Sequence, residues 1–406
     1  MAEKTNVPEI RFAGFTDPWE QRKLGEFGSV AMCKRIYKEQ TSEQGDVPFF
    51  KIGTFGANPD AFISNELFED FSRTYPYPTS GTLLISAAGS IGRIVEYQGE
   101  KAYFQDSNIV WLEHDHRLND AFLKPLYSQI EWGLEGSTIK RLYNKDLLRA
   151  EVTIPDGREQ KEIGQFFAKL DSLITLHQRK YDKLCAVKKS MLDKMFPKPG
   201  ETKPEIRFDG FTDPWEQCKL GELLLFQNGF NGSGESFGSG IPLISVMDVL
   251  DDGFITHEAV RGKARLSDEE ASRYCVEYGD VLFQRSSENQ EDAGTSNVYL
   301  DQHVSSAFGG FVIRGKKVGD YNPFFIKYLL SSSSIREQIT HRAQGAQHIN
   351  VSQDTLNDVA LLMSSMREQE AIGLVLLHLD NLITLHQHKL NLLRNTKKSL
   401  LDKMFV

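Results

Sequence analysis

Two long segments of the chain, residues 158–196 and 367–405, carry apolar side chains at alternating steps of four and three. This repeat of 3.5 residues is typical of helices that pair as a coiled coil. We therefore expect two long helices. Their seams would consist of Ile163, Phe167, Leu170, Ile174, His177, Tyr181 and Leu184 in the first segment and of Ile372, Leu376, Leu379, Ile383, His386, Leu390 and Leu393 in the second.

Polar residues interrupt both seams at equivalent places: His177 and Lys188 in the first, His386 and Lys397 in the second. A polar residue within an apolar seam fixes the register and the choice of partner. We expect the two helices to pair with each other in antiparallel fashion about a pseudo-twofold axis, with the two histidines near the crossing point. The alternative is that each helix packs on its own domain and that these side chains reach solvent.

Outside these segments, short apolar runs alternate with turns that contain glycine, which is the pattern of an α+β domain. The runs expected to form strands are residues 83–86, 108–113, 242–246, 280–284 and 309–314. Residues 120–134 and 322–339 are expected to be helical.

The chain also repeats itself. The phrase "EIRFAGFTDPWEQRKLGE" at residues 9–26 returns as "EIRFDGFTDPWEQCKLGE" at residues 205–222, and the two helical segments are identical at 23 of 39 positions. Fainter echoes relate residues 46–53 to 240–247 and residues 80–86 to 278–284. The chain is therefore two copies of one unit, each made of a phrase, a variable body and a helix.

These repeats predict an α+β fold of two tandem α/β domains separated by two long antiparallel coiled-coil helices. We expect a first domain at residues 1–157 and a first helix at 158–196. A linker at 197–204 follows, whose prolines and glycine stop that helix. The second domain is expected at residues 205–366 and the second helix at 367–406.

Composition narrows the class of protein. A chain of 406 residues with 40% hydrophobic and 25% charged residues suggests two to three soluble domains. The net charge of −9 argues mildly against a protein that coats nucleic acid through bulk charge. The four cysteines form no CxxC pair, and no apolar run approaches the ~20 residues of a membrane span. We expect a cytoplasmic protein without disulfides.

The repeated phrases hold the sequence most similar to a catalytic motif. Each contains Asp-Pro-Trp, at residues 17–19 and 213–215, but lacks the second proline and second glycine that an adenine-N6 methyltransferase carries. The glycine-rich stretches 89–92 and 231–240 fit neither a phosphate loop nor a dinucleotide fingerprint. The paired histidines at 114–116 and 386–388 lack further ligands at zinc spacing. We expect a recognition subunit with no catalytic or metal site of its own.

Together, the two "EIRF.GFTDPWEQ.KLGE" phrases and the two "REQ..IG......LD.LITLHQ.K" helices resemble the specificity (S) subunits of type I restriction–modification systems, the HsdS family. The resemblance covers essentially the whole chain. It implies that each body is a target recognition domain reading one half of a bipartite, asymmetric site in double-stranded DNA, and that the helices set the spacer between the halves.

The resemblance further implies a non-catalytic subunit on which two methylation (M) and two restriction (R) subunits dock. The complex would be a type I site-specific endonuclease and adenine-N6 DNA methyltransferase. S-adenosylmethionine, ATP and Mg would be bound by the partner subunits and no cofactor by this chain.

Candidate DNA-binding residues are those whose side chains can bond bases or phosphates. In the family, a loop before the last strand of each body lies near the DNA. The first body offers Lys140, Arg141, Asn144 and Lys145 in that loop, then Arg73, Arg93, Gln105, Ser107 and Asn108. The second body offers Gln347, His348, Asn350 and Gln353, then Arg285, Ser286, Asn289 and Gln290.

A different class of function remains open at this stage: a coiled-coil adaptor whose bodies bind other proteins or glycans. A salt-sensitive shift of duplex DNA by the chain and its methylation partner separates the two, because an adaptor gives none.

Overall fold

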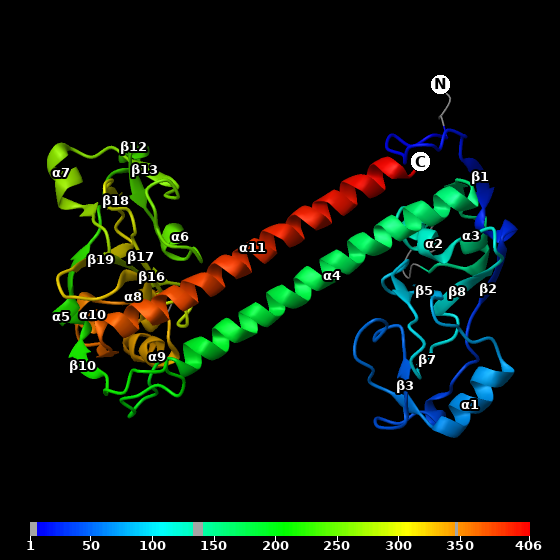
Figure 1. The fold of residues 1–406 in the computed structure, drawn as a ribbon, viewed down its shortest axis with the longest axis horizontal. Helices are drawn as coiled ribbons and strands as arrows, with labels where there is room; N and C mark the ends of the chain where they lie inside the picture. The colour runs from blue at the N-terminus through cyan, green and yellow to red at the C-terminus, as the bar shows by residue number, and fades with distance from the viewer. Residues whose placement is uncertain (1–5, 133–140, 346–347) are drawn as a thin grey trace. The chain divides into compact units, whose positions relative to one another are not determined.

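The computed structural model describes residues 6–132, 141–345 and 348–406 (Figure 1). The chain forms two compact units. Unit 1 comprises the chain up to residue 177 together with residues 389–406, and unit 2 comprises residues 178–388. Each unit thus contains one body, the beginning of the long helix that follows this body, and the end of the other long helix.

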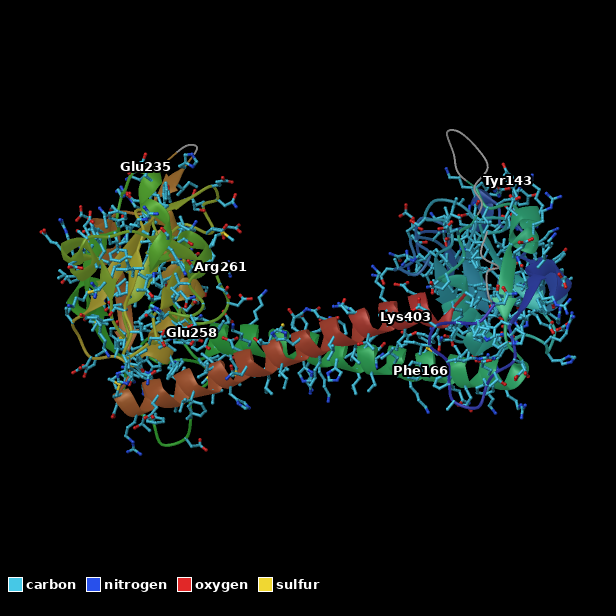
Figure 2. All side chains as sticks on the ribbon, turned by 90° about the horizontal axis from the view of Figure 1, so that it is seen from above. Tyr143, Phe166, Glu235, Glu258, Arg261 and Lys403 are labelled. Atoms are coloured by element: carbon cyan, nitrogen blue, oxygen red, sulfur yellow. The ribbon has the colours of Figure 1, made fainter. Side chains whose placement is uncertain are left out.

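The two long helices are confirmed as α4 (Gly157–Lys194) and α11 (Met366–Met404). Every predicted seam residue is buried or half-buried. In unit 1 the start of α4 packs against the end of α11, and Ile163 and Phe167 share a core with Leu401 and Met404. Figure 2 labels Phe166 of α4 and Lys403 of α11 on these two segments.

The lysines of the seams form ion pairs. In unit 1, Lys397 Nζ lies 2.6 Å from Asp171 Oδ1. In unit 2, Lys188 Nζ lies 2.6 Å from Asp380 Oδ1, the equivalent carboxylate of the second copy. Both contacts fit antiparallel packing within their own unit and argue against the alternative in which these lysines simply reach solvent.

Unit 1 holds a four-stranded sheet in the order β2-β8-β5-β6, a three-stranded sheet in the order β4-β3-β7 and the pair β1-β9. The strands are β1 (Glu20–Lys23), β2 (Gly28–Ala31), β3 (Val47–Phe50), β4 (Phe62–Ile63), β5 (Leu83–Ser86), β6 (Ile94–Glu96), β7 (Tyr103–Phe104), β8 (Ile109–His114) and β9 (Glu151–Ile154). The helices are η1 (Leu24–Glu26), η2 (Lys38–Gln40), α1 (Asn65–Thr74), α2 (Asp120–Tyr127) and α3 (Asn144–Arg149).

Unit 2 repeats this plan with the sheets β11-β19-β15-β17 and β13-β12-β18-β14 and the pairs β10-β21 and β16-β20. Its strands are β10 (Glu216–Lys219), β11 (Leu224–Asn228), β12 (Phe237–Ile244), β13 (Gly262–Ala264), β14 (Cys275–Val276), β15 (Val281–Gln284), β16 (Ser286–Ser287), β17 (Ser296–Val298), β18 (Ser306–Phe308), β19 (Val312–Lys317), β20 (Ile349–Asn350) and β21 (Ala360–Met363). Its helices are α5 (Leu220–Leu223), η3 (Gly234–Ser236), α6 (Val246–Val249), α7 (Asp268–Arg273), α8 (Pro323–Leu330), α9 (Ser333–Arg342) and α10 (Gln353–Asn357).

The faint echoes in the sequence fall on equivalent strands. The first pair of echoes lies on β3 and β12, which each pair in parallel with a later strand, and the second pair lies on β5 and β15. Both bodies therefore keep one topology although their sequences have diverged.

The two predicted short helices end earlier than expected, and serine is the reason. In place of one helix over 322–339, α8 stops at Leu330 and α9 starts at Ser333. The Ser331 and Ser332 hydroxyls donate to the carbonyls of Lys327 and Leu329, which competes with continuation of the helix. Likewise, α2 ends at Tyr127, and the Ser128 hydroxyl donates to the Pro125 carbonyl.

A buried ion pair joins the repeated phrase to the start of the long helix in each unit. Arg11 bonds Glu159 through two parallel contacts of 2.6 and 2.7 Å, and the Glu159 side chain is 0% exposed. Arg207 bonds Glu368 in the same way at 2.7 and 2.8 Å. The indole of Trp19 also donates to Glu159, at 3.2 Å. The phrase is therefore a packing segment that binds the helix.

Each phrase also receives the end of a long helix. Ile10 N donates to Lys403 O of α11 in unit 1, and Ile206 N donates to Lys194 O of α4 in unit 2. The aromatic residues beyond these ends pack alike. Phe405 stacks on Phe122 at 5.6 Å between ring centroids, and Phe196 lies 5.6 Å from Phe325.

The rest of the "REQ..IG" motif positions a short helix of the body. The side-chain oxygen of Gln160 accepts from Asn119 N at the start of α2, and that of Gln369 accepts from Asn322 N at the start of α8, both at 3.0 Å. A Cβ on Gly164 would lie 2.7 Å from the main chain of α2, so only glycine allows this approach. Gly373 has the same role against α8, where a Cβ would lie 2.9 Å from Phe325 N.

We expect Glu159→Ala to lower the free energy of unfolding of unit 1 by about 3–5 kcal/mol, because Arg11 then keeps a buried charge without its partner. The control is Glu20→Ala, which removes an exposed pair with Arg22 and should cost below about 1 kcal/mol. Chemical denaturation of both variants measures this difference. Equal losses would show that the pair contributes no more than a surface contact.

Candidate nucleic-acid interface

In unit 2, backbone bonds bring together three segments that lie far apart in the chain. Arg285 follows β15, and its N–H donates to Phe311 O at 2.9 Å while its carbonyl accepts from Val351 N at 2.9 Å. Ser286 and Asn350 face each other in the β16-β20 pair, where the Ser286 hydroxyl donates to Asn350 Oδ1 at 2.6 Å. We call this group, residues 285–286, 310–311 and 350–351, the second polar edge.

Unit 1 contains the equivalent arrangement. Ala87 follows β5, its N–H donates to Asn108 O at 2.7 Å, and its carbonyl accepts from Leu142 N at 2.9 Å. Ala88 pairs with Arg141 in an isolated bridge, and Arg141 Nη2 donates to Ser107 O at 2.9 Å. Residues 87–88, 107–108 and 141–142 form the first polar edge.

The first edge contains a conformation that bulky side chains avoid. Ser107 has a φ of 54°, which is in the left-handed region. Its carbonyl receives the Arg141 guanidinium, so the turn positions this arginine. Arg141 lies 6.0 Å from the ring of Tyr143, and Lys145 Nζ lies 5.7 Å from the same ring. Tyr143, labelled in Figure 2, is 45% exposed and lies close to both cations.

The structure separates the sequence candidates of the first body. Arg141, Ser107 and Asn108 meet at the first edge. The Gln105 side-chain oxygen instead accepts from Ile52 N at 2.9 Å, and Arg93 Nη2 donates to Gly56 O at 3.2 Å, which holds both side chains to the 52–56 loop. Of the other candidates, Asn144 begins α3, Arg73 is in the last turn of α1, and Lys140 lies outside the described residues.

The candidates of the second body divide in the same way. Arg285, Ser286 and Asn350 form the second edge, and exposed His348 is joined to it because its carbonyl accepts from Asn350 Nδ2. Gln290 Nε2 donates to Thr340 O at 2.8 Å, and Asn289 Nδ2 donates to Asp292. These two side chains are engaged within their own loop and with α9. Gln353 begins α10, and Gln347 lies outside the described residues.

Positive charge does not surround the second edge. The loop that follows Ser287 carries exposed Glu288, Glu291 and Asp292, and the glycine-rich loop carries Glu235, labelled in Figure 2. What the edge offers is a set of directional hydrogen-bonding groups beside an exposed ring. Such groups suit the reading of base edges better than the neutralisation of phosphates.

Two buried ionisable groups belong to the interior of the bodies. Burial raises the pKa of the Cys33 thiol to about 12. Burial lowers the pKa of Lys327 to about 8, and its ammonium donates to the Asp252 carbonyl at 2.9 Å and to Asn297 Oδ1 at 3.0 Å. These contacts tie α8 to the 252–253 turn.

No cluster of three or more His, Cys, Asp or Glu side chains that could hold a metal ion occurs within residues 6–132, 141–345 and 348–406. Over the same ranges, none of the helices combines the length and apolar character that crossing a membrane requires.

Sequence reasoning missed two residues at the edges, Tyr143 and Phe311. Tyr143 lay unremarked between the chosen Arg141 and Lys145, and an aromatic residue between basic ones is itself a signal for nucleic acid. Phe311 falls within residues 309–314, which the sequence predicts as a strand, whereas β19 begins only at Val312. Each unit therefore carries the same backbone frame with a different set of side chains at its edge.

Comparison with known proteins finds similar sequences of one kind. Residues 16–186 match the family model of the type I restriction modification DNA specificity domain. The protein S.HindORF215P of Haemophilus influenzae, by name a type I restriction enzyme specificity subunit, is 50% identical over 153 residues, which are 37% of this chain and 40% of that protein. The type I restriction enzyme MjaVIII specificity subunit of Methanocaldococcus jannaschii is 20% identical over 98% of this chain and 95% of its own length.

The fold has a counterpart among solved structures. The S subunit of a type I restriction–modification system from M. genitalium superposes with a TM-score of 0.59 and 16% identity, covering 98% of this chain and 99% of that one. The chain is thus similar in sequence to DNA specificity subunits of type I restriction–modification systems, as its repeated motifs indicated, and it shares its fold with one of their S subunits.

Proposed function

We propose that this chain is the sequence-specific DNA-binding subunit of a type I restriction–modification complex and that each body reads one half of a bipartite site. One observation carries the proposal: the two polar edges have the same backbone frame and different side chains. Arg141, Ala88 and Asn108 in the first correspond to Asn350, Ser286 and Phe311 in the second. Different side chains on one frame read different bases, so the site is asymmetric.

The repeated segments serve the partners. Leu176 and Leu385 occupy equivalent places in the identical "LITLHQ" runs, and each is 46% exposed. An exposed leucine that recurs in an identical segment favours a partner that binds twice. We assign these positions to the docking of two methylation (M) subunits, which two restriction (R) subunits join.

In this proposal the chain supplies recognition and the partners supply chemistry. S-adenosylmethionine, ATP and Mg bind to the partner subunits, and the complex is an endonuclease and an adenine-N6 DNA methyltransferase acting in the cytoplasm. The long helices set the spacer between the half-sites, because a helix gains a fixed 1.5 Å per residue.

Replacing residues 27–157 by the body of a related subunit should change one half of the methylated motif and leave the other half intact. The reason is that each edge is built within a single body. Methylome sequencing of a host with the chimera and its methylation partner reads the outcome. The reciprocal replacement of residues 223–366 is the control and should change only the other half. If either exchange altered both halves, the bodies would not be independent readers.

Inserting four residues after Tyr181 lengthens α4 by about 6 Å. We expect a longer gap between unchanged half-sites, again read from the methylome. An insertion of the same size in the 197–204 linker lengthens no helix and should leave the gap as it was. An unchanged gap in the Tyr181 variant, at full activity, would exclude the helices as the spacer.

Leu176→Glu combined with Leu385→Glu should prevent the binding of both methylation subunits, and either change alone should leave one. Both side chains are exposed, so the melting temperature should stay within a few degrees of wild type. Native mass spectrometry of the co-expressed subunits counts the bound partners. Leu392→Glu is the control, since Leu392 is 66% exposed but has Lys183 as its counterpart. Two bound partners on the double variant would exclude this docking site.

A further inference from the structure

Phe311 is a highly exposed aromatic residue at the second polar edge. The residue is 72% exposed, the largest value among the exposed apolar residues of the described chain. It stands directly before β19 and follows Gly309 and Gly310. An apolar ring left in water is unfavourable, and folding alone does not remove it from water.

The ring belongs to the second polar edge. Phe311 O accepts from Arg285 N at 2.9 Å, and Arg285 Nη1 lies 3.4 Å from Gly310 O. The neighbours of Arg285 along this edge are Ser286 and Asn350, whose side chains are bonded to each other. An apolar side chain therefore lies within a group of hydrogen-bonding side chains.

The turn that presents the ring is held from both sides. Val312 N donates to Gly309 O at 2.9 Å, and Phe230 pairs with Gly309 in an isolated bridge. A Cβ on Gly229 would lie 2.1 Å from the backbone oxygen of Gly309, so the two main chains approach closely here. The 229–231 segment thus packs against the turn, and Phe311 is presented from a fixed backbone.

The first edge has Asn108 at the equivalent place. Asn108 O accepts from Ala87 N in the first edge, as Phe311 O accepts from Arg285 N in the second. On the other side, Ala87 O accepts from Leu142 N, as Arg285 O accepts from Val351 N. One backbone position therefore carries an amide in one copy and a phenyl ring in the other. A position whose frame is kept while its side chain changes in kind is a position for recognition.

We infer that Phe311 recognises a thymine in the second half-site through the 5-methyl group of the base. This inference rests on the proposed function. A phenyl ring offers no conventional hydrogen-bond donor or acceptor, and the thymine methyl is the apolar group that base pairs present in the major groove. Arg285, Ser286 and Asn350 bond the polar groups of the neighbouring base pairs.

The test uses the full chain with its methylation partner, after the wild-type motif has been read by methylome sequencing. Binding is measured on duplexes in which each thymine of the motif is replaced in turn by deoxyuridine, which lacks only the methyl. At one position of the second half-site, wild type should lose about fourfold in affinity, the factor that corresponds to one buried methyl-sized group at ~0.8 kcal/mol. Phe311→Ala should bind thymine and uracil equally there.

Two variants sharpen the result. Phe311→Leu keeps an apolar side chain and should retain part of the preference for thymine. Leu225→Ala is the matched control, because Leu225 is 64% exposed and pairs with Lys316 toward the other end of β19. It should leave affinity and motif as in wild type.

Several results would overturn the inference. A second half-site without an A·T pair excludes it outright. Equal loss of affinity by Phe311→Ala on thymine and uracil duplexes shows that the ring acts without the methyl, for example as a wedge between base steps. Failure of Phe311→Ala to bind the methylation partner without DNA makes the ring a protein contact. By contrast, a wild-type complex that methylates no specific site refutes the proposed function itself.

Discussion

A buried arginine–glutamate pair at the start of each long helix is the contact on which the rest of the structure depends. Glu159 and Glu368 lie in the first turn of α4 and α11, and each accepts a bidentate arginine from the phrase that opens its own copy. Two charges without water are stable only when paired, so the phrase, the helix start and the body between them take one arrangement. The carboxylate near the helix N-terminus also complements the helix dipole.

This frame explains how the two bodies could diverge. At both polar edges, hydrogen bonds between backbone atoms join the segments, such as those from Ala87 to Asn108 and from Arg285 to Phe311. Backbone bonds do not depend on which side chain a residue carries. Side chains at the edge can therefore change in kind while the topology stays, whereas a change at Glu159 or Gly164 would disturb the frame. The division between repeated and variable sequence follows this division between frame and edge.

Much of the frame could be predicted from the sequence, because its signals are periodic and local. The 3.5-residue repeat indicated α4 and α11, and the duplicated phrase indicated two equivalent halves. The ion pairs of Lys188 and Lys397 could not be foreseen, since a seam pattern reveals an interrupting charge and not the carboxylate that meets it across the helices. The break at Ser331 was missed because the hydroxyl that ends a helix also occurs within helices.

The candidate site was harder to predict. Three segments of the chain meet at each edge through long-range backbone hydrogen bonds. No local sequence pattern predicts which loops will meet. Arg141, Ser107 and Asn108 were chosen for their chemistry and do meet, but Gln105 and Gln290 have the same chemistry and are held within the body. Phe311 was passed over because a phenylalanine is expected inside a fold, and only its exposure identifies it.

The composition of the units has a consequence for synthesis on the ribosome. Unit 2 is one continuous stretch, residues 178–388, whereas unit 1 is completed only by residues 389–406. The aromatic cluster of Trp19, Phe122 and Phe167 receives Phe405, which is translated after all of unit 2. Unit 1 therefore cannot complete its core until unit 2 has been translated. A prematurely terminated chain would leave this aromatic cluster exposed. Chaperones and proteases would then bind the truncated chain before it could compete with the full chain for partner subunits.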